Sequence, residues 1–418
     1  MGVHLERALL LFEQCRYDMA MGELQSELTD YPYEARAHAL LGLCLNMQQK
    51  YEQATESAKS AIALSPNLPF THYVLGYIAC DRNQFNEAQE SLQEAIRINP
   101  FEASYFALLS RCKYNQKLWQ DALDAASNGL AIEPENIECL NYRALALSQL
   151  GKGEEALAIA ENAISQSPQD AASYASSGWI LLNHGKSPQK ALEYFREALR
   201  LNPNFEWARQ GIIEALKAQN PIYRLMLRYF AWSSRLNSRN RWIFIVGLYI
   251  AVRLLLGSFA SVGWTTFAGV LAGIYLLFIY FSWIADPLFT LLLRLNKFGR
   301  LALSETEMQQ SNWWGACCVI AVLSLLLLLF TKTVSSLSAV FVFSLLLLPL
   351  AAVFYCKEGW TRKTMTIYTA VLAVIGISGM LISFINKSIF LIPMAVFLIG
   401  AVASSWLASY LIGITPRK

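Results

Sequence analysis

The chain has 418 residues, of which 55% are hydrophobic, and a formal net charge of +3. That total hides two opposed halves, because residues 1–218 carry 18 basic and 27 acidic residues whereas residues 219–418 carry 16 and 4. An acidic first half gives no electrostatic basis for binding nucleic acid. The long apolar runs of the second half exceed what a soluble core needs, so they predict a membrane domain.

Prolines mark a repeat with a period of about 34 residues in the first half. The prolines at this spacing are Pro32, Pro66, Pro100, Pro134 and Pro168, and Pro203 follows one residue late. Proline lacks the backbone donor and restricts the residue before it, so each one ends a helix. Self-similarity at this period predicts stacked units, none of which can bury its apolar face alone. The six expected units are about residues 1–34, 35–68, 69–102, 103–136, 137–170 and 171–205.

Each unit has the pattern of a helical pair. Apolar residues at helical spacing form a first helix, and a turn such as Gly151-Lys152-Gly153 precedes a second helix, here predicted over residues 154–166. Small residues recur in phase with the prolines, so we expect the two helices of a unit to approach closely. These small residues are Gly42, Gly76, Ser110, Ala144 and Gly178 in the first helices and Ala54, Ala88, Ala122 and Ala156 in the second helices.

This pattern resembles the tetratricopeptide repeat over about residues 1–205. The motif positions are occupied in the third unit by Leu75-Gly76, Ala88, Leu92, Ala95 and Pro100. The resemblance implies an all-α solenoid, a right-handed superhelix whose first helices line a concave groove. Departures are Arg7-Ala8 in the first unit, Lys113 at an aromatic position, and Pro188, which accompanies a turn one residue longer.

Inward positions of the first helices predict the surface that meets a partner. They are Leu43, Tyr73, Tyr77, Arg111, Tyr114, Asn141, Leu145, Trp179 and Asn183. Family members that capture a terminal carboxylate use a clamp of Lys, Asn and Arg, and these positions do not reproduce it. The set therefore favours an extended or helical protein segment held by aromatic contacts and amide hydrogen bonds. Alternatively, some of these side chains pack between adjacent layers instead.

A capping helix and a basic linker are expected after the repeats. Residues 205–218 carry an apolar side that includes Trp207, so they would close the open end of a solenoid, and the first domain is predicted as residues 1–218. Residues 219–241 predict an amphipathic helix at the membrane surface, which would attract anionic headgroups; the alternative is the first part of a longer buried helix. Its basic residues are Arg224, Arg228, Arg235, Arg239 and Arg241.

The last domain, residues 242–418, is predicted to be a six-helix transmembrane bundle. Six segments come near the ~20 apolar residues that a span needs. They are residues 242–262, 264–285, 313–331, 336–356, 365–386 and 388–412. A second interfacial segment is expected at about residues 287–301, with Arg294, Lys297 and Arg300, followed by a capping box of Ser304 and Glu307.

Basic residues in the loops predict the orientation of these spans. One side collects the linker arginines, Arg294, Lys297, Arg300 and the segments near residues 357–363 and 417–418, whereas the other offers Lys332 and Lys387. This asymmetry predicts that the repeats and both termini are cytoplasmic. Near the span ends, tryptophans are expected at the headgroup level. They are Trp264, Trp283, Trp313, Trp314 and Trp360.

The sequence contains few residues in patterns that indicate catalysis, metal binding or transport. Arg253 lies in the first predicted span and is the candidate for a functional intramembrane charge, although a lone arginine more often snorkels. Gly376 and Gly379 flank Ser378 as in a serine motif, but the histidines all lie in the first half, so close helix contact explains these glycines better. We expect no catalytic residue, metal site or cofactor. The scattered cysteines indicate small packing residues.

The leading hypothesis is therefore a membrane-anchored scaffold or adaptor and not an enzyme. Its cytoplasmic groove would bind a protein partner and support assembly of a membrane-associated complex, and its spans could bind another membrane protein. The alternative is a transporter or channel regulated by the repeats. A hydrated, polar cavity near Arg253 would favour transport, whereas a dry bundle filled by leucines would favour anchoring.

Overall fold

A computed structural model describes residues 2–235, 250–255, 265–295, 300, 303–356, 359–385 and 390–414. Every regular element in these ranges is a helix. The chain forms two compact units, of which one ends at Ala208 and the other begins at Arg209. The predicted all-α class is confirmed, and each unit is described in turn.

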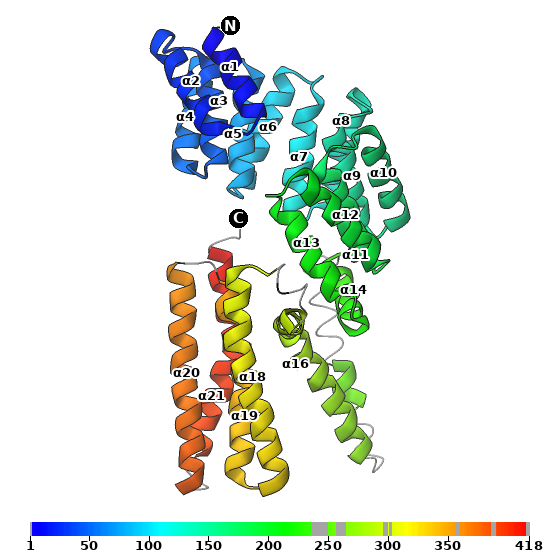
Figure 1. The fold of residues 1–418 in the computed structure, drawn as a ribbon, viewed down its shortest axis with the longest axis vertical. Coiled ribbons are helices and arrows are strands. Elements are labelled where there is room, and N and C mark those ends of the chain that lie inside the picture. Colours follow the sequence, from blue (N-terminus) through cyan, green and yellow to red (C-terminus); the bar gives the residue numbers. More distant parts are fainter. Residues whose placement is uncertain are drawn as a thin grey trace. The chain divides into compact units, whose positions relative to one another are not determined.

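Six antiparallel helical pairs make up the first unit (Figure 1). The first helices are α1 (Val3–Glu13), α3 (Ala35–Met47), α5 (Pro69–Asp81), α7 (Ala103–Asn115), α9 (Ile137–Gln149) and α11 (Ala171–Asn183). The second helices are α2 (Tyr17–Asp30), α4 (Tyr51–Leu64), α6 (Phe85–Ile98), α8 (Trp119–Ile132), α10 (Gly153–Gln166) and α12 (Pro188–Leu201). Each of the six prolines lies just beyond the end of a second helix, as the repeat predicted.

Every hairpin of this array turns through one residue in the left-handed region. These residues are Cys15, Gln49, Asn83, Lys117, Gly151 and Gly185, and each lies one full repeat after the one before. The register therefore holds through the last turn, and the extra residue enters only afterwards, before α12 begins at Pro188. There Ser187 Oγ accepts a hydrogen bond from the Lys190 backbone amide and caps α12.

The small residues act as predicted at the contact between paired helices. A Cβ on Gly76 would lie 2.8 Å from Leu92 Cγ, and a Cβ on Gly178 would lie 2.7 Å from the ring of Phe195. Real Cβ atoms do not approach so closely, so neither site admits a larger residue without movement of its partner. The serine in this series makes the same contact in another way, because Ser110 Oγ donates to the Ala122 carbonyl at 2.7 Å.

The predicted capping helix is α13 (Glu206–Lys217), and the boundary between the two units lies within it. Within the first unit, Trp207 stacks on Trp179 with 6.1 Å between ring centroids, and its carbonyl accepts a hydrogen bond from Trp179 Nε1. Within the second unit, Ile213 packs with Leu293 and Leu303. One helix thus supplies apolar side chains to both cores.

Among the described residues, four helices of the second unit are long and apolar enough to cross a membrane, whereas six spans were predicted. They are α18 (Glu305–Thr331), α19 (Val334–Tyr355), α20 (Trp360–Ile385) and α21 (Leu391–Ile414) (Figure 1). Most of the first expected span, residues 242–262, lies outside the described residues. The second expected span lies in α16 (Thr265–Leu295), which does not qualify among the described residues.

Helix α16 differs from the prediction at its carboxyl end. It continues through Pro287 to Leu295, so no separate segment begins at Asp286-Pro287. The amphipathic helix expected in the linker is α14 (Pro221–Arg235). The capping box before α18 is confirmed, because Ser304 Oγ accepts from the Glu307 amide and the Glu307 carboxylate accepts from the Ser304 amide.

Two details of the bundle bear on the sequence predictions. Trp314 is buried and donates its indole N–H to the Leu347 carbonyl at 3.2 Å, so its side chain packs between α18 and α19. The indole had a partner on α19 that no local pattern records. Close helix contact at Gly376 is confirmed, because a Cβ there would lie 2.9 Å from Val342 and 3.0 Å from Phe397.

Candidate protein-binding groove

Tyrosines gather on one face of the first helices, which we call the groove face. Tyr73 lies 6.3 Å from Tyr77 along α5 and 5.4 Å from Tyr105 of α7, measured between ring centroids. Tyr114 of α7 lies 6.3 Å from Tyr142 of α9. The constant repeat length places these rings on consecutive first helices. Tyr105 is buried at 6% exposure, and the other four rings form a half-buried aromatic surface that crosses from one repeat to the next.

Arg111 lies at the middle of the groove face, and its guanidinium contacts other side chains of that face. Its guanidinium pairs with Asp81 and lies 4.8 Å from the centroid of the Tyr77 ring. Asp81 accepts a second hydrogen bond from Asn46 Nδ2 at 2.6 Å. Burial lowers the pKa of Arg111, but nearby Tyr142 and Asp81 raise it well above its usual range, so the guanidinium stays charged. Arg111 therefore holds Asp81 and Tyr77 of α5 in place on the groove face.

Glu138, at the start of α9, is a functional candidate in the middle of the groove that the sequence prediction missed. Its carboxylate is exposed and makes no hydrogen bond or ion pair with any described residue. It nevertheless lies deep enough that desolvation raises its pKa, while Arg111 lowers it and Asp170 raises it. An accessible carboxylate that is poorly solvated and unpaired suits a donor or cation from a partner.

The other predicted groove residues divide by exposure. Leu43, Asn141 and Leu145 are 7%, 5% and 4% exposed, so their side chains pack between layers and leave little surface for a partner. Trp179 is half-buried beneath Trp207, and Asn183 is half-buried too. The members of the predicted set that keep accessible surface are thus the tyrosines, Arg111, Trp179 and Asn183, all of them half-buried.

The basic residues that were predicted to lie at the membrane surface differ in their exposure and their contacts. Arg224 donates from Nε to the Ala218 carbonyl at 3.0 Å, so it caps the end of α13. Arg228 and Arg300 are exposed, and Arg294 donates to Asn312 Oδ1. The side chain of Arg235, and Arg239, Arg241 and Lys297 altogether, lie outside the described residues. Arg253 is exposed in residues 250–255.

A buried ion cluster in the second unit was not predicted. Lys217 of α13 is 5% exposed, and its Nζ lies 2.6 Å from Asp286 Oδ1 of α16 and 3.2 Å from Glu214 Oε1. Tyr223 of α14 donates to Glu214 at 2.7 Å, and Tyr355 of α19 donates to Asp286 at 3.0 Å. Burial lowers the pKa of Lys217, but the two carboxylates raise it above its usual value. The cluster ties four helices together.

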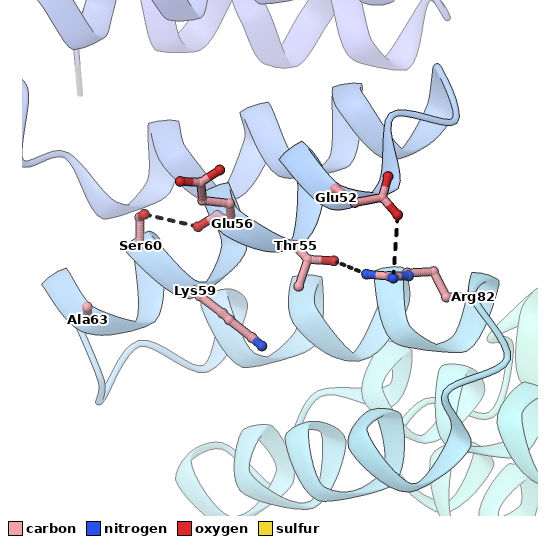
Figure 2. Close-up of a pocket in the computed structure, with 7 residues that line it drawn as sticks. All are labelled: Glu52, Thr55, Glu56, Lys59, Ser60, Ala63 and Arg82. Atoms are coloured by element: carbon pink, nitrogen blue, oxygen red, sulfur yellow. Dashed lines mark hydrogen bonds and ion pairs between the residues drawn. The ribbon is translucent and has the colours of Figure 1, made fainter.

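A shallow hollow of about 550 Å³ lies on α4, away from the groove face (Figure 2). Its polar groups largely satisfy one another, because Arg82 donates to Thr55 Oγ1 at 2.8 Å and lies 3.7 Å from Glu52. It is wide open to solvent, so it would bury little of any ligand. Its lining residues are Glu52, Thr55, Glu56, Lys59, Ser60, Ala63 and Arg82.

Neither metal nor thiol chemistry is indicated in the described part of the chain. No group of three His, Cys, Asp or Glu side chains there could hold a metal ion. The eight cysteines are free, and burial raises the pKa of Cys44 and Cys139 to about 12, which keeps both thiols protonated. What the first unit offers is therefore a binding surface.

Comparisons with known proteins agree with this geometry. A family model described as tetratricopeptide repeat matches residues 5–69, 73–136 and 143–204. The comparison with curated proteins found no match.

Among solved structures, a tetratricopeptide repeat protein from Parabacteroides merdae is 14% identical over 51% of this chain and 83% of its own, with a TM-score of 0.44. A thermophilic TPR protein of Thermus thermophilus is 19% identical over 44% and 98%, with a TM-score of 0.40. YrrB, described as a TPR protein with an unusual peptide-binding site, is 18% identical over 45% and 96%, with a TM-score of 0.32. Such distant neighbours carry no argument about partners. The family model and the unbroken register of the turns together show that residues 5–204 are tetratricopeptide repeats.

Proposed function

We propose that the protein is a membrane-anchored scaffold whose groove face binds a segment of a partner protein. The observation that carries this proposal is the groove face itself. Tyr73, Tyr77 and Tyr114 form a half-buried aromatic surface across successive repeats, with the unpaired carboxylate of Glu138 beside it. Tyrosines supply large contact areas at low entropic cost, so they are frequent at protein interfaces.

Binding fits the groove better than catalysis does. General acid–base chemistry most often uses histidine, and the four histidines make contacts elsewhere. His38 and His72 each bond a proline carbonyl at the preceding turn, at 3.0 and 2.8 Å. His4 pairs with Glu23, and His184 contacts Ser148. The acidic and aromatic groups of the groove thus have no histidine among them.

Support for membrane anchoring comes from the four apolar helices of the second unit. Their interior is packed by apolar clusters, such as Val342 and Leu346 of α19 with Phe397 of α21. The buried hydroxyls of Ser324 and Thr369 bond within their own helices, to the carbonyls four residues earlier. Such packing favours an anchor over a solute pathway. Exposed apolar side chains on α14 further support contact with the membrane surface.

Affinity purification of the intact protein in detergent tests the proposal. We expect Tyr77→Ala and Tyr114→Ala to lose partners that the wild type retains, because each removes a large part of the aromatic surface. Tyr33→Ala is the matched control, since Tyr33 is 83% exposed in the turn before α3. Circular dichroism must show that each variant is folded. Recovery of the same proteins with all three variants would contradict the proposal that the groove face binds a partner.

A further inference from the structure

A small apolar pocket opens at the amino-terminal end of the groove face. It has a volume of about 240 Å³ and is formed by the consecutive first helices α1, α3 and α5. Leu5 and Leu40 are buried at 2% and 1% exposure, whereas Leu9 and Phe70 are half-buried. The volume is below the range of about 300–1,000 Å³ typical of small-molecule sites, so the pocket suits a side chain of a larger ligand.

Arg36 provides a positive charge at the pocket. It is one of the residues that line it, it is exposed, and its guanidinium pairs with no described residue. A guanidinium forms two parallel hydrogen bonds with a carboxylate. The pocket therefore suits an apolar side chain with an acidic one beside it.

Arg36 belongs to a row that runs along the groove face. The row consists of Arg36, Phe70, Ser104 and Glu138, each one repeat from the next and each in the first turn of its helix. Equivalent positions of stacked repeats align, so the row has a cation at one end and a carboxylate at the other. Both charges are exposed and unpaired among the described residues.

We infer that this row selects the direction of the bound segment. Arg36 pairs with an acidic side chain beside a bulky apolar residue that fills the pocket, and Glu138 pairs with a basic side chain farther along. Three steps between adjacent helices, each of about 8–10 Å, separate the two charges by roughly 25–30 Å. An extended segment covers that length in about eight residues. A segment of reversed charge order would place like charges together at both ends.

This inference rests on the proposed function, and a peptide selection separates the two. A random peptide library displayed on phage is selected against the full-length protein in detergent. For the wild type we expect enriched peptides with an acidic and a bulky apolar residue at one end and Lys or Arg at the other. The variant R36E/E138K keeps the net charge of the protein but exchanges the charges at the two ends of the row. It should bind wild-type peptides about tenfold or more weakly and enrich peptides of the opposite charge order.

The matched control is the exchange E94R/R97E, because Glu94 and Arg97 form an exposed pair within the second helix α6. It should keep the wild-type peptides. Peptides that need Tyr77 but show no charge order would overturn the inference and leave the groove proposal standing. Peptides that ignore Tyr77 would overturn both. A change of oligomeric state in R36E/E138K would identify a second copy of the chain as the occupant and would also overturn the inference.

Discussion

At the scale of single residues, the turns of the repeats show how much geometry outweighs residue type. The left-handed position of each hairpin is held by glycine only twice, at Gly151 and Gly185. Elsewhere a residue with a Cβ occupies it, as Lys117 does with φ of 63°. Left-handed backbone costs a residue with a Cβ about 1–2 kcal/mol, so helix packing on both sides of the turn must offset that cost.

Replacing Lys117 with glycine should therefore stabilise the first unit by up to ~1 kcal/mol, because relief of strain exceeds the added entropy of the unfolded chain. Urea unfolding followed by circular dichroism measures the change. Gln116→Gly is the control, since Gln116 has an ordinary φ of −74° and glycine there brings only the entropic cost. Equal effects of the two substitutions would show that the turn is not strained.

Glu138 shows a second effect at the residue scale. Its folded-state pKa is raised, so ionisation of this carboxylate costs stability at pH values above that pKa, and the cost disappears as the pH falls. We expect Glu138→Gln to leave the stability at pH 7 unchanged or raise it by at most ~0.5 kcal/mol, since the group is exposed. Thermal unfolding at pH 7 and pH 4 checks this, and a clear loss of stability at pH 7 would mean that the carboxylate has a structural partner.

At the scale of elements, the buried cluster of Lys217 determines how α13 and α14 join the second unit. Lys217 and Asp286 are 69 residues apart in the sequence and 2.6 Å apart in the structure. Because α16 continues through Pro287, it carries Asp286 on a regular helix. Asp286 and Glu214 both face the ammonium, so its loss would leave two neighbouring carboxylates without their cation.

Lys217→Met should destabilise the second unit by at least ~2 kcal/mol, at the low end for a buried pair because Asp286 is partly exposed. The folded-state pKa of Lys217 is raised, so its contribution is complete below pH ~10.4, the value for an unfolded lysine, and is lost as the pH rises further. Thermal unfolding in detergent from pH 7 to 11 measures both effects. Lys190→Met, at an exposed pair with Glu161, should change little. Equal losses in the two variants would argue against the cluster.

At the scale of the whole molecule, the basic loops predict the orientation in the membrane. With four spans, Arg362 and Lys363 lie on the same side as the residues that precede α18, whereas Lys332 lies in the opposite turn. The charge asymmetry predicts that the repeats lie in the cytoplasm, and this prediction depends on the positive charge of one side and the lack of it on the other.

A membrane-impermeant thiol reagent tests it. Cys15 is exposed in the first unit, so it should be labelled only after the membrane is opened, whereas a cysteine introduced as Lys332→Cys should be labelled in intact cells. The wild type, which lacks the introduced thiol, is the control for background labelling. Labelling of Cys15 in intact cells would show the opposite orientation, with the groove outside the cytoplasm.

Local patterns allowed much of the fold to be predicted. Prolines, small residues and the Ser304 capping box act within one turn or one hairpin, so their sequence spacing translates directly into helix ends and contacts. The exposure of groove positions could not be read in this way. Leu43 and Tyr77 occupy equivalent positions in successive repeats, yet only Tyr77 is long enough to emerge between the layers. Repeat spacing could have found Arg36 and Glu138, because they share a position with Phe70.

The sequence by itself determined the repeat, its period, the helical pairs and the apolar character of the second half, since these follow from short-range periodicity and backbone restrictions. Only the tertiary structure decided that Trp314 is buried, that Lys217 meets Asp286, and that a pocket opens beside Arg36. Each of these depends on which helices pack together and how completely their side chains fill the space between them. That outcome involves residues far apart in the chain, so no local pattern contains it.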